Sequence, residues 1–203
     1  MNRLLVPCLL FTLCLSPAAR AQRPAPPPPE SSSPAWLPRG AMVGTSIRGG
    51  AVAPQVRLNW QVPFYRGRLD SLSLLIEPMA AYTVAFPSTL DEDDDVPGTL
   101  DSLRFYSLLA GVAYRSRRGA GFEWGFQIGT GPAWYSARFS GASKDKESYF
   151  VGLLDGRAQI GYNFGRISAG VVVGYGDPYN YRRTSLSRPF VGGLHLGLYS
   201  EWR

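Results

Sequence analysis

The sequence ends, over residues 190–203, with FVGGLHLGLYSEWR, and the residue types in this stretch alternate. One face would carry apolar side chains with an aromatic ring at each end: Phe190, Leu194, Leu196, Leu198 and Trp202. The opposite face would carry glycines and polar groups, among them His195, Tyr199 and Glu201. A period of two indicates a β-strand whose faces meet different surroundings. An apolar face bounded by aromatic rings, opposite a polar face, is typical of a transmembrane barrel strand.

Seven earlier segments alternate in the same way and are separated by turn residues. They are residues 40–49, 55–64, 71–86 and 103–115, a segment that starts at Phe122, and residues 148–164 and 166–176. Proline cannot donate a backbone hydrogen bond. We therefore expect Pro78 to cause a local bulge and Pro132 to end the pairing of its segment before Trp134.

The connections between these segments differ in length and polarity. Residues 65–70, 116–121 and 165–166 are short, residues 87–102, 140–147 and 177–188 are longer and polar, and residues 49–54 are a short exception. Short periplasmic turns and long outer loops are the pattern of outer-membrane barrels. The sequence therefore predicts an all-β fold, an eight-stranded antiparallel up-and-down transmembrane β-barrel with both of its ends on the periplasmic side.

Aromatic side chains are expected in two rows, one near each membrane interface. The periplasmic row would hold Phe64, Tyr114, Trp124, Tyr162 and Trp202. The outer row would hold Tyr82, Phe86, Tyr106, Phe150, Tyr175 and Phe190. Tyr and Trp prefer the interfaces because their rings are apolar but have a polar edge. A soluble sandwich or lipocalin also has a period of two, but it has no reason to place rings at both ends of its apolar face.

The N-terminal part of the chain differs in composition from the rest. Residues 1–21 have the short positive start, apolar run and small-residue cleavage site of a secretory signal peptide, and they contain both cysteines, Cys8 and Cys14. Residues 22–39 are rich in Pro and Ser and are expected to form a periplasmic linker, followed by the barrel domain over residues 40–203. The net charge of +6 comes from dispersed basic residues. Without a recognisable motif, this charge does not indicate nucleic acid as a partner.

Residues 40–203 resemble the small eight-stranded outer-membrane β-barrels of the OmpA/OmpX type in pattern, length and topology. Trp202, close to the C-terminus, also resembles the terminal signal that such barrels present to their assembly machinery. The resemblance implies an exported, integral outer-membrane protein that contacts outer-membrane lipid and lipopolysaccharide. It also implies assembly by the barrel assembly machinery, a monomeric state and no cofactor.

Charged side chains on the inward faces are candidates for an ionic network in the lumen: Arg48, Arg57, Glu77, Arg115, Glu123, Asp155, Arg157, His195 and Glu201. Arg57 and Glu77 are expected on neighbouring strands at similar distances from their shared turn. Eight strands leave an interior just wide enough for side chains, where an unpaired charge is costly. We therefore expect opposite charges to pair and to plug the lumen. A gated path for ions is the alternative.

His195 is the only histidine and raises the possibility of catalysis. Lipid A deacylase barrels carry a serine two residues after their histidine, and Gly197 stands at that position here. We therefore expect no catalytic residue and a protein that is not an enzyme, with a structural or surface-interaction role. A solute or ion channel and, behind it, a lipid A-modifying enzyme are the alternatives.

An acidic run in the second outer loop comprises Asp91, Glu92, Asp93, Asp94 and Asp95. Its carboxylates are candidate cation contacts, because hard cations prefer oxygen ligands. The run lacks the spaced ligands of an EF-hand loop, and a solvated loop explains its composition equally well. We expect no metal centre.

Overall fold

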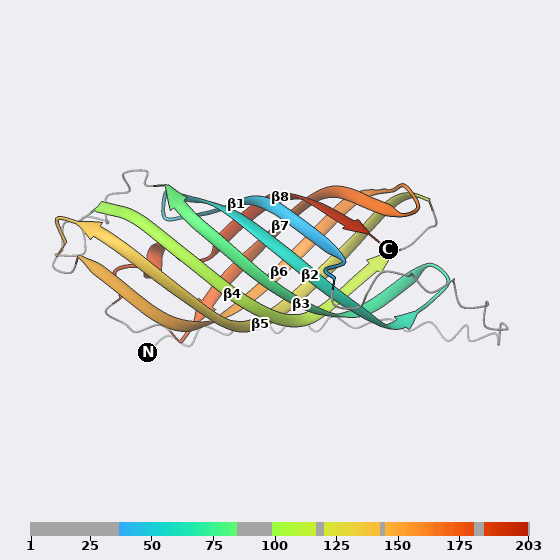
Figure 1. Ribbon diagram of the computed structural model, residues 1–203, viewed down its shortest axis with the longest axis horizontal. Helices are drawn as coiled ribbons and strands as arrows, with labels where there is room; N and C mark the ends of the chain where they lie inside the picture. The colour runs from blue at the N-terminus through green and yellow to red at the C-terminus, as the bar shows by residue number, and fades with distance from the viewer. Residues whose placement is uncertain (1–36, 85–98, 117–119, 143–144, 181–184, 203) are drawn as a thin grey trace, which may run out of the picture. The chain divides into compact units, whose positions relative to one another are not determined.

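The computed structural model describes residues 37–84, 99–116, 120–142, 145–180 and 185–202. In this part of the chain, eight antiparallel strands pair in chain order, and the first pairs with the last to close a barrel (Figure 1). The strands are β1 (Gly40–Arg48), β2 (Ala51–Arg66), β3 (Asp70–Val84), β4 (Thr99–Ser116), β5 (Gly121–Ser140), β6 (Lys146–Asn163), β7 (Ile167–Tyr179) and β8 (Gly193–Trp202). A short 3₁₀ helix, η1 (Arg188–Phe190), precedes β8. The predicted fold class is confirmed.

Some predictions lie outside the described residues and stay predictions. They are the signal peptide, most of the linker, the acidic run of residues 91–95, and the aromatic ring of Phe86. Among the described residues, no helix is long and apolar enough to cross a membrane.

The two ends of the barrel differ. Gly40 pairs with Glu201, so the chain enters and leaves the barrel at the same end, which we call the terminal end. The opposite end carries η1 and is called the loop end. Figure 1 shows η1 and the C-terminus of β8 at opposite ends of the barrel.

Burial alternates along the strands, with mostly apolar residues outside and, inside, both polar residues and an apolar cluster that includes Leu103, Phe105 and Leu153. On β3, Glu77 is 1% exposed, whereas its neighbour Ile76 is 53% exposed. On β8, His195 is buried and Leu196 is 46% exposed. A water-soluble protein rarely leaves so many large apolar side chains on its surface. The distribution fits a barrel whose outer face meets lipid.

Aromatic side chains gather near each end of the outward face. Tyr114 and Trp124 lie toward the terminal end, with ring centroids 5.4 Å apart. Tyr106 and Trp134 lie toward the loop end and stack at 5.5 Å. The distance along β5 from Trp124 to Trp134 is about ten residues, within the roughly 9–11 residues with which a tilted strand crosses a bilayer. The two rows therefore delimit a band of membrane thickness.

The structure places Phe190 differently from the prediction. Phe190 lies in η1, is 5% exposed and packs inside the barrel, so it does not belong to the outer aromatic row. The reason is the pair that follows, Gly192 and Gly193, with φ angles of +83° and +100°. This left-handed backbone favours glycine and turns the chain just before β8 begins.

The two prolines also act differently from the prediction. β5 continues through Pro132, which pairs with Gly152 of β6, and only the ladder to β4 is interrupted beside it. Pro132 lacks the N–H for one ladder but leaves the other intact. Pro78 keeps its pairing with Leu108 and causes no shift of register. The register shift between β2 and β3 lies instead at Phe64.

Candidate functional site: the filled lumen

Four charged side chains from three strands meet across the middle of the lumen. Arg57 on β2 lies 3.0 Å from Glu77 on β3 and 3.1 Å from Asp155 on β6. Arg157, also on β6, lies 2.8 Å from Glu77. A 2.9 Å ion pair between Arg157 Nε and Asp155 Oδ1 closes the ring, although this contact lacks the geometry of a hydrogen bond. With His195, these residues form what we call the central cluster.

The central cluster contains two arginines and two carboxylates, so the charges of the four side chains balance. Each side chain is at most 4% exposed. Buried ions are tolerated only when partners compensate for their lost hydration. Each arginine here contacts both carboxylates, so removal of any member leaves an excess charge in a dry interior.

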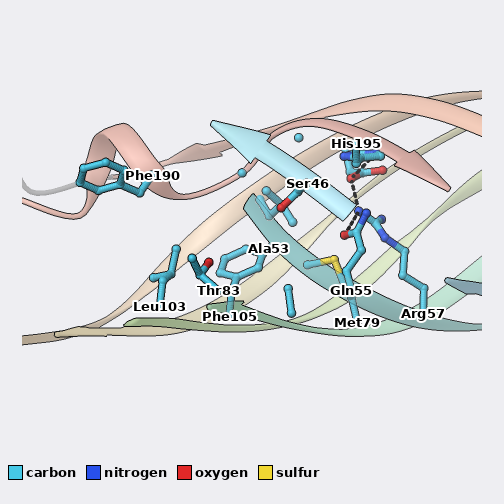
Figure 2. Close-up of a pocket in the computed structure, with 15 residues that line it drawn as sticks. Ser46, Ala53, Gln55, Arg57, Met79, Thr83, Leu103, Phe105, Phe190 and His195 are labelled. Carbon is cyan, nitrogen blue, oxygen red and sulfur yellow. Dashed lines mark hydrogen bonds and ion pairs between the residues drawn. The ribbon is translucent and has the colours of Figure 1, made fainter. Parts of the chain in front are cut away.

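His195, a member of the central cluster, also lines a small cavity on the loop-end side of the cluster. Its Nε2 lies 3.4 Å from Asp155 Oδ2. Gln55 accepts a hydrogen bond from Arg57 at 3.2 Å. Figure 2 shows His195, Gln55 and Arg57 at one end of the cavity and Phe190 at the other. The cavity has a volume of about 20 Å³, which is room for about one water molecule.

Two uncharged polar atoms that line this cavity have no hydrogen-bond partner among the described residues. They are the Nε2 of Gln55 and the Oγ1 of Thr83. Ser46 also lines the cavity, and it pairs with His195 across the β1–β8 ladder. A single water molecule bridging such groups would satisfy them.

A second buried cluster, the terminal-end cluster, comprises Arg115, Glu123, Ser168, Tyr199 and Glu201. Arg115 pairs with Glu201 and lies 3.7 Å from Glu123. Glu123 also accepts hydrogen bonds from Tyr199 and Ser168, each at 3.1 Å. The lumen is therefore crossed by polar contacts at two depths.

Residues 185–191 fold into the loop end of the barrel and are called the plug. Glu147, at the start of β6, accepts hydrogen bonds from the Ser187 hydroxyl at 2.8 Å, from the Ser185 hydroxyl at 3.1 Å, and from two backbone N–H groups of the plug at 3.2 Å. Tyr135 shares a 3.0 Å hydrogen bond with Ser185. Val191 is completely buried. The sequence analysis expected paired charges to fill the lumen, but it did not predict that residues 185–191 fold into the barrel. The contacts of this segment join two connections that were both predicted to be polar loops.

Arg48 does not join either buried cluster, contrary to the prediction. It lies at the loop end, 2.8 Å from Asp177, with the two side chains 24% and 59% exposed. Arg48 also donates to the Val191 carbonyl at 3.0 Å, so it contacts the plug. The turn at Gly49 and Gly50 follows immediately, and the end of a strand reaches the mouth of a barrel rather than its interior.

The strand count, the closed sheet and the filled lumen define the class: the chain folds as a small eight-stranded outer-membrane β-barrel. No protein-family model and no curated protein sequence matches it. Among solved structures, it is similar to the outer membrane enzyme PagL, with a TM-score of 0.55 and 13% identity over 80% of this chain and 98% of PagL.

Two further barrels are more distantly similar. The neisserial surface protein NspA has a TM-score of 0.48 and 11% identity, over 81% of this chain and 94% of NspA. The Yersinia pestis attachment invasion locus protein Ail, solved with the heparin analogue sucrose octasulfate, has a TM-score of 0.38 and 14% identity, over 80% of this chain and 93% of Ail. At these identities the similarities concern the fold.

The comparison with PagL overturns one prediction. We expected a protein that is not an enzyme, because Gly197 occupies the position of the deacylase serine. PagL has this fold and is an outer membrane enzyme, so that expectation is wrong.

Proposed function

We propose that the protein is an integral outer-membrane β-barrel with a sealed lumen and a structural or surface-interaction role. The observation that carries the proposal is the central cluster, in which Arg57, Glu77, Asp155 and Arg157 bridge the lumen from three strands. An ion passing through would have to break these contacts, and each broken contact would leave a buried charge without its partner.

The other contents of the lumen support the same proposal. The terminal-end cluster lies on one side of the central cluster and the plug on the other, so the described part of the barrel is filled at three depths. An interior of eight strands has room for side chains but not for a water-filled channel beside them. The channel alternative requires all three layers to rearrange.

Cell fractionation tests the location. We expect the protein in the outer-membrane fraction, and we expect unheated samples to migrate differently from heated ones on SDS gels because the closed sheet resists detergent. Recovery as a soluble periplasmic protein would contradict the proposal. Swelling of proteoliposomes in sugars of graded size tests closure, and any uptake beyond that of empty liposomes would favour the channel.

A second candidate function, ester hydrolysis, is favoured by one constellation. Ser46, Asp155 and His195 line the same cavity, and these residue types can act as nucleophile, orienting acid and base. The cavity of about 20 Å³ has no room for a substrate, so hydrolysis would require the plug to move. The test is to assay the wild type and the S46A variant for hydrolysis of ester substrates, and to analyse lipid A by mass spectrometry after incubation with each protein. Turnover lost in S46A would establish this function, and its absence in both would remove it.

A further inference from the structure

An apolar groove lies on the outward face of the barrel, between β1 and β4. Its outward-facing lining comprises Val43, Pro54, Val56, Ala80, Tyr82 and Tyr106. Ala80 pairs with Val56 on one side and Tyr106 on the other, so its small side chain leaves a depression between larger neighbours. The groove has a volume of about 390 Å³, within the roughly 300–1,000 Å³ of small-molecule sites.

A positive charge lies at the loop-end side of this groove. Arg104 pairs with Tyr82 across the β3–β4 ladder, and its Cζ lies 5.7 Å from the centroid of the Tyr82 ring. A guanidinium over a tyrosine ring is held by a cation–π interaction. Arg104 lies two residues beyond Tyr106 along β4, so it is just outside the apolar band that the aromatic rows delimit.

More cations continue from Arg104 around the loop end. Arg138 on β5 pairs with Ser102 on one side and Lys146 on the other. Among the described residues, Arg104, Arg138 and Lys146 form no ion pair. The nearby acidic side chain of Asp101 is exposed and accepts a hydrogen bond from Ser140. Among the described residues, the headgroup level of this face therefore carries Arg104, Arg138 and Lys146, with the exposed carboxylates of Asp101 and Asp145 beside them.

We propose that the groove and Arg104 together bind lipid A, the phosphorylated, acylated anchor of lipopolysaccharide. One acyl chain would lie in the groove against Tyr82 and Tyr106. A phosphate would accept hydrogen bonds from the Arg104 guanidinium, whose planar set of donors fits phosphate oxygens. The inference rests on the proposed outer-membrane location, in which the loop end faces outward and the groove opens into the outer leaflet. The cations on three adjacent strands favour a lipid with more than one phosphate over a glycerophospholipid.

Native mass spectrometry of the folded barrel in detergent, titrated with purified lipid A, tests the proposal. R104Q removes the charge and A80F fills the groove. R166Q, in the exposed β6–β7 turn, and A158F, on the outward face of β6, are the matched controls. Heat-modifiable gel mobility verifies that each variant is folded. We expect R104Q and A80F each to weaken lipid A binding about tenfold, the scale of a lost charge-assisted contact, and the controls to change it less than about twofold.

Several outcomes would overturn the proposal. Equal binding by all variants would show that neither the groove nor Arg104 is the site. Undiminished binding of dephosphorylated lipid A would remove the role of Arg104. If phosphatidylglycerol bound as tightly as lipid A, and if R104Q and A80F weakened its binding to the same extent, the groove would be assigned to a glycerophospholipid. The measurement is made in detergent and needs neither a sealed lumen nor a cellular location, so its failure is distinguishable from failure of the proposed function.

Discussion

Replacing Glu77 with alanine would leave two arginine side chains facing one carboxylate in the lumen. Glu77 is 1% exposed and lies 3.0 Å from Arg57 and 2.8 Å from Arg157. Breaking a buried ion pair by removing one partner costs about 3–5 kcal/mol, because the charge left behind stays desolvated. We expect E77A to lower the free energy of unfolding by this amount.

The double variant E77A/R57A isolates the role of the orphaned charge. It leaves Arg157 and Asp155, which already lie 2.9 Å apart as an ion pair, so the charge of the cluster balances again. We therefore expect the double variant to recover part of the loss, with a non-additive coupling of about 1–3 kcal/mol. T83V is the control on the same face of β3. It removes a buried hydroxyl that has no hydrogen-bond partner among the described residues, and we expect it to cost about 1 kcal/mol or less.

Reversible unfolding of the barrel in lipid vesicles, followed by tryptophan fluorescence in urea, measures these free energies. The reasoning is refuted if the costs of E77A and R57A simply add in the double variant, because additive costs would mean that the two charges do not interact. A cost for E77A no larger than that for T83V would refute it as well.

Three further predictions concern other parts of the barrel. Leu196 faces outward in the apolar band, so L196R should cost about 2–4 kcal/mol in the same unfolding assay, and no loss would mean that this face does not meet lipid. A Cβ on Gly174 would collide with Arg157 Cγ and His195 Nε2, so G174A should cost about 1–3 kcal/mol, and an unchanged stability would contradict the packing described here. Glu147 anchors the plug, so E147A should expose residues 185–191 to limited proteolysis while the strands stay protected, and a wild-type digestion pattern would show that the plug is held by other contacts.

Much of the fold follows from alternation along the strands. A period of two fixes which side chains point inward, and it does so without knowledge of their partners. Arg57 and Glu77 both occupy inward positions of the alternating pattern, on the two strands joined by one short turn. Their contact could therefore be expected from the sequence. Asp155 and Arg157 follow the same rule on β6.

The exceptions arise where a strand ends. Phe190 has the spacing of an outward residue, but the positive φ angles of Gly192 and Gly193 separate it from β8. Arg48 has the spacing of an inward residue, but it lies at the mouth of the barrel. Alternation predicts the face of a residue only while the strand continues, and the sequence pattern does not mark its last residue.

The plug shows a second limit of the sequence. Glu147 and Ser187 are far apart in the chain and belong to connections of ordinary polar composition. Their pairing depends on how two connections meet at the loop end, which is a property of the closed barrel. No local spacing relates the Glu147 carboxylate, at the start of β6, to the backbone N–H groups of a distant connection that donate hydrogen bonds to it.

Single-channel recording in planar lipid bilayers tests the sealed lumen most directly. We expect bilayers containing the wild-type barrel to show no conductance above that of the bare membrane in 1 M KCl. Stable openings of the wild-type protein, with a conductance that scales with salt concentration, would contradict the account and establish a channel.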